Sequence, residues 1–442
     1  MNPHPSPVPR DKQPGKQRIL KAYQRRTQET DMAEHAFPYV LVGGGLASAS
    51  AAEAIRKADA NSPILIVGSE KHPPYNRPPL SKEHLRGEET NNIPLLIHPE
   101  AWYKDNNVTL FSGVTAVGGD VSQKAIVLDN GDTVRYQKLL VATGASPKPL
   151  DIPGVDSPHV HTLRTWDDSD KLHAHLGQKL ILVGGGYIGV EVAAGFLMTN
   201  GQATIIEPTD HLWSKFASPE YGAFLKAKLE AAGAEIILGD EVTEIIPTGV
   251  RTKQGREITG DVVLVAVGVA PNLAFGKALG LDIDDQKNGI LANEYLETSA
   301  ADVYAAGDVA GFSDPILGKQ WRVEHWNNAL WHGEIAGANM AGGRVAYDHI
   351  PHFFSDELDI DFKLYGDPQG GKGGLFHGTV QSGRFDELYL TEDGRVAMVI
   401  SVNPPDDLLP TLDALVRQKP SVRGREAEVQ NARFNLQSLL TA

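Results

Sequence analysis

Two glycine-rich segments carry the residue spacing that a bound dinucleotide requires. Gly43 and Gly45 follow one apolar run, and Gly184 and Gly186 follow a second, similar run. A pyrophosphate binds backbone N–H groups at a helix N-terminus, where the helix dipole favours negative charge, and a Cβ at the closest approach would block it. Because this motif occurs twice, the sequence predicts two dinucleotide-binding units.

An acidic residue follows each motif at the end of the next apolar run. These residues are Glu70 and Glu207, and each could instead be a solvated turn residue. A carboxylate at this position hydrogen-bonds a ribose diol and repels a 2′-phosphate. Since no arginine occurs between Glu207 and Lys215, we expect the second unit to prefer NADH to NADPH.

Composition excludes several classes of function. The chain of 442 residues has a net charge of −15 and no cysteine. Nucleic acid and anionic membrane surfaces are therefore poor partners, and disulfides, thiolate metal sites and dithiol relays are excluded. No metal site is predicted. The apolar run 180–197 contains Glu191 and glycines, so we expect a strand, a turn and a helix there and no membrane span.

The elements that must position these turns follow from hydrophobic patterning. Helices are expected over 47–57 and 188–198, and strands over 64–67, 203–206, 138–141, 261–267 and 303–305. The fold class is α/β: two Rossmann-like domains of the three-layer ββα type and a small α+β C-terminal domain with an antiparallel sheet over 387–390 and 396–402. The predicted boundaries are a disordered tail 1–36, a first domain 37–152 and 271–343, a second domain 153–270, and a C-terminal domain 344–442.

Further motifs make a family recognisable. They are Pro74-Tyr75-Asn76-Arg77-Pro78-Pro79-Leu80-Ser81-Lys82, Ala142-Thr143-Gly144-Ala145-Ser146-Pro147, Ala266-Val267-Gly268-Val269-Ala270-Pro271-Asn272, Tyr304-Ala305-Ala306-Gly307-Asp308 and Arg322-Val323-Glu324-His325-Trp326-Asn327-Asn328-Ala329. The chain resembles the ferredoxin-reductase-like branch of the FAD/NAD-linked reductases, the cysteine-free branch of the pyridine nucleotide-disulfide oxidoreductases. That branch includes the NADH reductases of bacterial oxygenase systems and apoptosis-inducing factor.

The resemblance implies that the first domain binds FAD and the second binds NAD. The residues implied for FAD are Gly43, Gly45, Leu46, Ala47, Glu70, Arg77, Lys82, Ala142, Thr143, Gly144, Lys148, Asp308, Glu324, His325 and Trp326. Those implied for NAD are Gly184, Gly186, Tyr187, Ile188, Gly189, Glu191, Glu207 and Gly268. Lys148 stands where close relatives carry arginine.

The chemical step needs a cation beside the flavin. A hydride passes from nicotinamide C4 to flavin N5 and leaves an electron-rich ring, which a fixed positive charge stabilises. Lys82 is the candidate, and the resemblance implies that Glu191 is its ion-pair partner. It also places His325 and Trp326 near the flavin and nicotinamide, with Tyr187 as a shield over the flavin face.

Two functions remain open at this stage. Because no cysteine is available, electrons should pass from the flavin directly to an external acceptor, a ferredoxin-like protein or a quinone. The alternative is an NADH redox sensor like apoptosis-inducing factor, in which an NADH-induced conformational change or dimerisation is the function; a scaffold that no longer binds FAD is a third, weaker hypothesis. We expect the C-terminal domain to form an acceptor surface or a homodimer contact, and a cytoplasmic location, or a mitochondrial one in a eukaryote.

Overall fold

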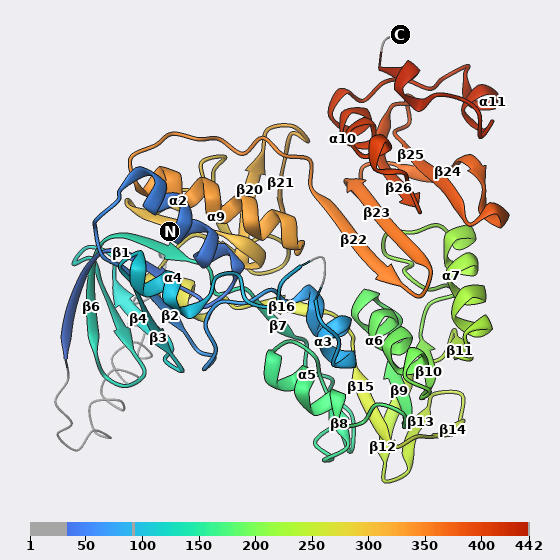
Figure 1. Ribbon diagram of the computed structural model, residues 1–442, viewed down its shortest axis with the longest axis horizontal. Helices are drawn as coiled ribbons and strands as arrows, with labels where there is room; N and C mark the ends of the chain where they lie inside the picture. Colours follow the sequence, from blue (N-terminus) through green and yellow to red (C-terminus); the bar gives the residue numbers. More distant parts are fainter. Residues whose placement is uncertain (1–32, 91–92, 441–442) are drawn as a thin grey trace, which may run out of the picture.

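The computed structural model describes residues 33–90 and 93–440. The first strand begins at Glu34 and pairs from that residue onward. Residues 34–36 therefore belong to the sheet and not to the predicted tail; residues 1–32 of that tail lie outside the described part of the chain. The first α/β unit combines the blue and teal part of the chain with the yellow and orange elements around α9, and the second unit is the green part between them; the C-terminal segment lies against the second unit (Figure 1).

The first sheet is built around the strand that precedes the Gly43 turn. Its strands are β1 (Glu34–Val42), β2 (Ile64–Gly68), β3 (Val108–Ser112), β4 (Ala116–Asp120), β5 (Ala125–Leu128), β6 (Thr133–Val141) and β19 (Val303–Ala305). Their order is β3-β2-β1-β6-β5-β4, and β19 also pairs with β6. Strands β3, β2, β1, β6 and β19 are parallel neighbours. Val40, Leu41 and Val42 are buried, as expected for a parallel strand covered on both faces.

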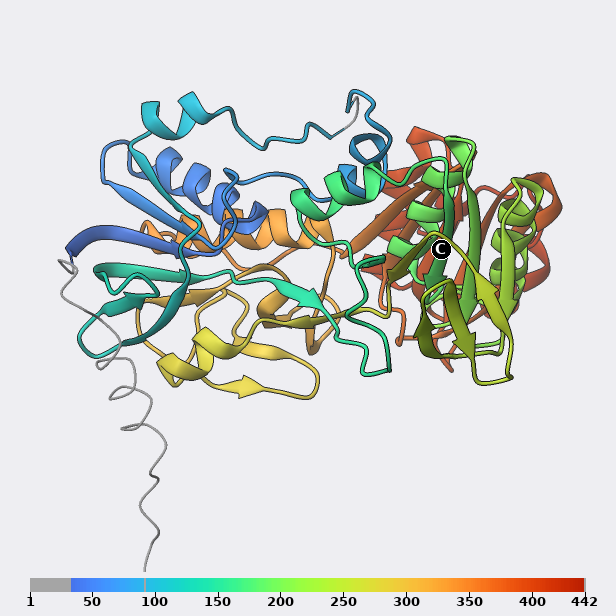
Figure 2. The ribbon, with the colours of Figure 1, turned by 90° about the horizontal axis from the view of Figure 1, so that it is seen from below.

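Helices α2 (Leu46–Ala58) and α9 (Trp326–Met340) cover one face of this sheet (Figure 2). Two glycines of α9 allow the helices to touch. A Cβ at Gly333 would lie 2.3 Å from the Ala47 oxygen, and one at Gly337 would lie 2.4 Å from the Ala51 oxygen. The contact draws α9, which is far away in sequence, to the helix that follows the first glycine turn.

The second unit repeats the design. Its parallel strands are β8 (Val160–His161), β9 (Lys179–Val183), β10 (Gln202–Glu207), β11 (Glu235–Leu238) and β15 (Val262–Val265). The order is β11-β10-β9-β15-β8. Helices α6 (Tyr187–Met198) and α7 (Pro219–Ala231) cover one face, and the antiparallel strands β12 (Val242–Ile246), β13 (Gly249–Thr252) and β14 (Glu257–Thr259) cover the other.

The C-terminal segment forms an antiparallel sheet that shares a core with the second unit. Its strands are β22 (His352–Glu357), β23 (Ile360–Gly366), β24 (Lys372–Thr379), β25 (Arg384–Leu390) and β26 (Val396–Val402), in the order β22-β23-β26-β25-β24. One face packs Phe362 and Ile400 against Phe196 and Leu225 of the second unit. The other face is covered by α10 (Leu409–Gln418) and α11 (Glu426–Val429). The segment expected as a third domain thus has one face inside a shared core.

The segments that connect the two α/β units lie side by side. Strand β7 (Ala145–Pro147) pairs antiparallel with β16 (Val269–Pro271). The proline-rich boundaries predicted near these positions are therefore a paired ribbon (Figure 1).

The remaining elements are η1 (Pro78–Ser81), α3 (Glu83–Arg86), α4 (Glu100–Asp105), α5 (Trp166–His173), α8 (Ala274–Leu279), β17 (Ile283–Asp284), β18 (Gly289–Ala292), η2 (Gly307–Val309), β20 (Ala310–Asp314), β21 (Lys319–Arg322), η3 (Val380–Ser382), η4 (Asp406–Leu408) and η5 (Leu436–Leu439).

Most elements expected from patterning are confirmed. The helices after both glycine turns, the strands after them and the C-terminal strands lie where they were predicted, while the strand expected over 261–267 is the shorter β15. The apolar run 180–197 divides into β9, a turn and α6. Within residues 33–90 and 93–440, no helix combines the length and the apolar character needed to cross a membrane.

The α2–α9 contact can be tested by adding one methyl group. In Gly337→Ala the new Cβ collides with the Ala51 backbone, which cannot rotate away, so we expect a loss of about 1–3 kcal/mol in the free energy of unfolding. Urea denaturation of the purified protein measures it. Glu334→Ala, on the exposed side of the same helix, should stay within about 0.5 kcal/mol of the unmodified chain; equal losses in both variants would contradict the packing argument.

Candidate functional site

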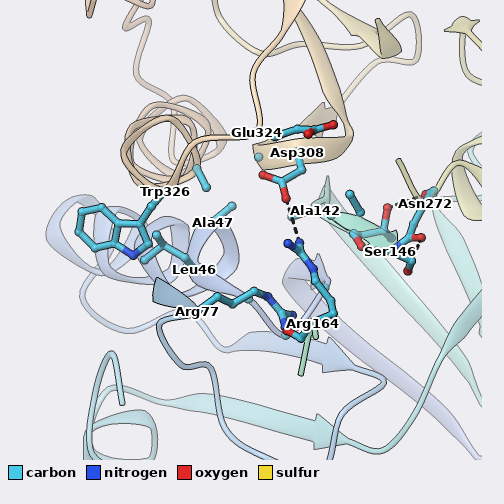
Figure 3. A pocket seen from close by; sticks show the side chains of 18 of the residues that line it. Leu46, Ala47, Arg77, Ala142, Ser146, Arg164, Asn272, Asp308, Glu324 and Trp326 are labelled. Atoms are coloured by element: carbon cyan, nitrogen blue, oxygen red, sulfur yellow. Dashed lines mark hydrogen bonds and ion pairs between the residues drawn. The ribbon is translucent and has the colours of Figure 1, made fainter. Parts of the chain in front are cut away.

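A cavity of about 500 Å³ lies where the two α/β units and the C-terminal sheet meet. It is lined at one end by the Gly43 turn and Glu70, and at the other by Lys82, Glu191 and Phe353. Figure 3 shows side chains that line it, with Arg77 and Arg164 on one side and Asp308 on another. Because its walls come from widely separated segments, tertiary packing creates it.

The first glycine turn fits a bound pyrophosphate. Gly43 has a φ of +127°, and a Cβ there would lie 2.0 Å from the Ala142 oxygen, so the turn itself requires glycine. Gly45 differs, because no atom of the described chain lies within 4 Å of its Cβ position. A side chain at Gly45 would project beside the cavity at the N-terminus of α2. The empty space is what a phosphate approaching the helix N-terminus needs.

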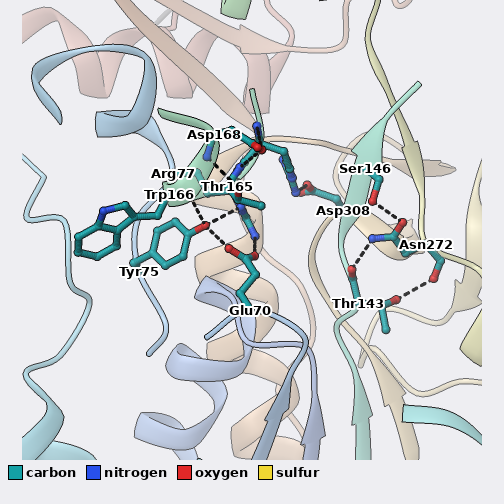
Figure 4. Close-up of polar contacts among 11 residues, drawn as sticks. Glu70, Tyr75, Arg77, Thr143, Ser146, Thr165, Trp166, Asp168, Asn272 and Asp308 are labelled. Atoms are coloured by element: carbon teal, nitrogen blue, oxygen red, sulfur yellow. Dashed lines mark hydrogen bonds and ion pairs between the residues drawn. The ribbon is translucent and has the colours of Figure 1, made fainter. Parts of the chain in front are cut away.

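Glu70 is held in place by two neighbours of the same segment. One carboxylate oxygen accepts a hydrogen bond of 2.7 Å from Arg77, and the other accepts from the Tyr75 hydroxyl (Figure 4). Arg77 also donates to the backbone oxygen of Arg164. A carboxylate offers about four lone-pair sites. Glu70 therefore retains acceptor capacity for a ribose hydroxyl.

Arg164 is a cavity residue that no sequence motif indicated. It precedes α5, whose capping box joins Thr165 and Asp168. Its guanidinium donates to the Asp308 carboxylate at 2.9 Å (Figure 3). Asp308 was predicted to bind FAD, and the structure adds a fixed cation beside it. Only the fold brings Arg164 there, since it lies outside the motifs of the first unit.

Asn272 locks the loop that follows β6. Its amide donates to the Thr143 oxygen at 2.9 Å, its side-chain oxygen accepts from Ser146 at 2.9 Å, and its backbone oxygen accepts from the Thr143 hydroxyl at 2.8 Å (Figure 4). Gly144 in this loop has a φ of +66°. The sequence singled out Thr143 and Gly144 but gave Asn272 no role. Asn272 comes from the second connecting segment and fixes their position.

Lys82 and Glu191 form a buried ion pair at the far end of the cavity. The ammonium lies 2.6 Å from the carboxylate, and the two side chains are only 9% and 5% exposed. Burial lowers the pKa of Lys82, but the surrounding acidic groups, Glu191 first, more than offset this, and the net shift of the pKa is upward. Lys82 therefore stays charged. Ser81 and Ser355 also donate to Glu191.

Aromatic side chains close this end of the cavity. Tyr187, the first residue of α6, packs on Phe353 of β22 with ring centroids 4.4 Å apart. Trp326 lines the cavity and donates its indole N–H to Asn76 at 2.8 Å. His325 is not among the lining residues, although its neighbours Glu324 and Trp326 are. Its ring lies next to Phe353, and burial lowers its pKa to about 4, so the imidazole is neutral near pH 7.

The second glycine turn repeats the geometry of the first. Gly184 has a φ of +103° and would place a Cβ 2.7 Å from the Ala266 oxygen, whereas the Cβ position of Gly186 has its nearest atom at 3.9 Å. A Cβ at Gly189 would collide with the Gly184 oxygen at 2.6 Å. Glu207 accepts from the Gly185 N–H at 2.8 Å. The predicted ribose-binding carboxylate thus lies against the turn.

The structure brings most of the predicted residues to the cavity and leaves some outside it. Lining it are Gly43, Gly45, Leu46, Ala47, Glu70, Arg77, Lys82, Ala142, Thr143, Gly144, Tyr187, Ile188, Glu191, Asp308, Glu324 and Trp326. The other residues predicted for NAD lie in the second unit: Gly184 and Gly186 in its glycine turn, Gly189 in α6, Glu207 at the end of β10 and Gly268 between β15 and β16. Lys148, the residue after β7, is exposed and does not line the cavity.

Comparison with known proteins identifies the family to which the chain belongs. Residues 37–333 match the family described as pyridine nucleotide-disulphide oxidoreductase. The chain is 32% identical over 395 residues to the probable ferredoxin reductase CtmF of Castellaniella defragrans, with 88% of this chain and 95% of that protein covered. It is 33% identical over 394 residues to the ferredoxin–NAD(+) reductase component of the p-cumate 2,3-dioxygenase system of Pseudomonas putida, covering 88% and 96%.

Solved structures of ferredoxin reductases have a fold similar to that of this chain. A ferredoxin reductase from Rhodopseudomonas palustris superimposes with a TM-score of 0.84 at 29% identity, over 91% of this chain and 99% of that one. The covalent putidaredoxin reductase–putidaredoxin complex also gives a TM-score of 0.84, at 26% identity, over 93% of this chain and 99% of that one. The similarity therefore extends through the C-terminal sheet.

The two open glycine positions allow a matched test. Gly45→Ala should lower the affinity for FAD at least about tenfold while the fold is kept, because the methyl group meets no protein atom but occupies the phosphate approach. The ratio of flavin absorbance to protein and a titration of the apoprotein measure this. Gly186→Ala should retain FAD and weaken NADH binding instead. Identical phenotypes for the two variants would contradict the assignment of the turns.

Proposed function

Since the chain belongs to the pyridine nucleotide-disulphide oxidoreductase family, we propose that it is the NADH-dependent reductase of a ferredoxin-like iron–sulfur protein. The observation that supports this most directly is the buried Lys82–Glu191 pair at the wall of the cavity, in a chain without cysteine. A redox cleft with a fixed cation and no thiol has no dithiol to reduce, so its electrons leave for an acceptor outside the chain.

The wider activity follows from the family. The chain is an FAD flavoprotein that oxidises NADH and passes the electrons to an external acceptor. When bound, FAD accepts two electrons from NADH together and can release them one at a time. The name of the family refers to a disulfide, but this chain has no cysteine. The flavin is therefore the last redox group within the chain, and the electrons pass from it directly to the external acceptor.

The residues of the chain have separable tasks in this proposal. Gly43, Gly45 and Glu70 bind the adenosine diphosphate half of FAD, and Arg77 and Arg164 supply positive charge along the cavity. Gly186 and Glu207 bind NADH. A carboxylate at Glu207 disfavours a 2′-phosphate.

Lys82 is the group that acts on the reaction. Its ammonium is charged and immobile, so it stabilises negative charge on the cofactor without a reorganisation cost. Glu191 acts through Lys82: it holds the ammonium in place and accepts three hydrogen bonds, from Lys82, Ser81 and Ser355. Tyr187 and Phe353 form an aromatic wall at this end of the cavity.

A ferredoxin-like acceptor is favoured over a quinone by the relatives. Several relatives that match over more than four fifths of this chain are named ferredoxin reductases or ferredoxin–NAD(+) reductase components. Ferredoxins take one electron at a time, which matches stepwise release from a flavin. The homodimer and the cytoplasmic location expected from the sequence stay predictions. Gel filtration with and without NADH tests the first of these.

Lys82 has a measurable effect under this proposal. Lys82→Met should slow reduction of bound FAD by NADH roughly 100-fold, because a single positioned electrostatic group typically contributes this much, while FAD remains bound. Stopped-flow absorbance of the flavin band measures the rate. Lys57→Ala removes an exposed lysine that pairs with Glu53 on the surface and serves as the charge control. An unchanged rate in Lys82→Met would refute the role.

The acceptor is tested directly. The NADH-reduced holoprotein is mixed separately with a plant-type ferredoxin, a water-soluble quinone and oxygen, and the reoxidation rate of FAD is followed. We expect the ferredoxin to reoxidise FAD fastest, at rates near or above about 1 per second, in the usual range for enzymes. Slow reoxidation by all three, with a persistent NAD-bound charge-transfer band, would favour the redox sensor instead.

A further inference from the structure

A second buried carboxylate lies behind the Lys82–Glu191 pair and has no role in the proposed function. Glu357, the last residue of β22, is 1% exposed. One of its oxygens contacts the Ser355 hydroxyl, and the other has no hydrogen-bond partner among the described residues. An ionised carboxylate in this position would carry a large desolvation cost. Its protonation state therefore requires an explanation.

The number of hydrogens that the Ser355 hydroxyl can donate indicates the protonation state of Glu357. The Ser355 hydroxyl contacts both Glu191 and Glu357, but a hydroxyl has only one hydrogen to donate. Glu191 faces the Lys82 ammonium at 2.6 Å and accepts from Ser81 as well. Among the described residues, Glu357 has no such cation in contact with it, so Ser355 donates to Glu191. The contact between Ser355 and Glu357 is then a hydrogen bond only if Glu357 carries a proton and donates it.

We propose that Glu357 is a proton-binding site coupled to the redox state of the bound flavin. At rest it donates its proton to Ser355, and Ser355 donates to Glu191, which holds Lys82 at the cavity wall. When the cavity gains negative charge on reduction, Glu357 holds this proton more tightly. Glu357 is thus a positioning residue that acts through Ser355 and Glu191. The inference rests on FAD binding and not on the identity of the acceptor.

The charged and titratable neighbours of Glu357 are consistent with this role. They are Glu191 on α6, Lys82 between η1 and α3, Asp356 on β22 and Tyr221 on α7; on β23 the residue opposite is the apolar Ile360. Burial, and then the charge of Glu191, raise the pKa of Glu357 to about 8, although the Lys82 ammonium lowers it. The carboxyl is therefore protonated at pH 7 and ionises just above it.

The number of protons taken up when the flavin is reduced should depend on the charge state of Glu357. Two-electron reduction of a flavin near neutral pH takes up one proton and leaves one added negative charge. Where Glu357 is already ionised, that charge favours its protonation, and the step becomes two electrons and two protons, the second taken from solvent onto a Glu357 oxygen. Electron and proton uptake are thereby linked over the pH range in which Glu357 titrates.

The test is the pH dependence of the flavin midpoint potential. The FAD-loaded protein is titrated spectroelectrochemically with redox mediators between about pH 6 and pH 10, a range that brackets the raised pKa. Above about pH 8 the slope of the wild-type curve should steepen by one proton per two electrons. In Glu357→Gln the steepening should vanish, so that the two curves coincide at low pH and the wild-type potential falls below that of the variant at high pH.

Two further outcomes keep the proposal falsifiable. A wild-type curve without the steeper region overturns it, whether or not Glu357→Gln retains FAD. Wild-type and variant curves that run parallel throughout also overturn it. Neither measurement involves ferredoxin. If ferredoxin fails to reoxidise the flavin, the inference about Glu357 is unaffected, and if the potential curves contradict the inference, the proposed acceptor is unaffected.

Glu387 provides a matched control. It is fully buried on β25, burial raises its pKa to about 7, and it accepts from Ser218, Tyr389 and Gly374. Both glutamates have raised pKa values in the folded state, so each contributes stability that is full below the unfolded pKa and is lost as pH rises through the folded pKa. Glu387→Gln and Glu357→Gln should both flatten that loss, but only Glu357→Gln should change the potential curve.

Discussion

The buried ion pair between Lys82 and Glu191 is the constraint on which the arrangement of the units depends. An ammonium and a carboxylate removed from water cost several kcal/mol each unless they face one another. Lys82 comes from the first unit and Glu191 from α6 of the second, 2.6 Å apart. Helix α3 packs on α6 beside the pair, with a Cβ position at Gly195 only 3.3 Å from Leu85. Any shift between the units would leave two buried charges unpaired.

The C-terminal sheet completes the same region. Because one of its faces shares a core with the second unit, β22 is held against α6 and supplies Phe353 to the cavity wall and Ser355 to Glu191. Three segments far apart in sequence therefore meet at one carboxylate. The charge state of Glu357 on this strand reaches the cavity through that carboxylate, which makes the C-terminal sheet part of the redox site.

The cations along the cavity share one design. Arg77 is held by Glu70 and Arg164 by Asp308, as Lys82 is held by Glu191. Each guanidinium or ammonium is fixed before a ligand arrives, so binding an anionic dinucleotide requires little reorganisation. The pairing also reduces the cost of placing positive charge in a partly buried cleft. A chain with a net charge of −15 thus keeps local positive charge where a pyrophosphate would lie.

The sequence alone determined what depends on local spacing. Glycines after apolar strands, with acids at the next strand ends, predicted both βαβ units, because φ values and helix N-termini are set within a few residues of each other. Lys82 and Glu191 were matched through motif resemblance. Arg164, Asn272, Ser355 and Glu357 were not assigned roles, and His325 and Lys148 do not line the cavity. Those outcomes depend on which distant segments pack together, and only the tertiary structure decides that, since burial and pairing of charges arise from contacts that no local pattern records.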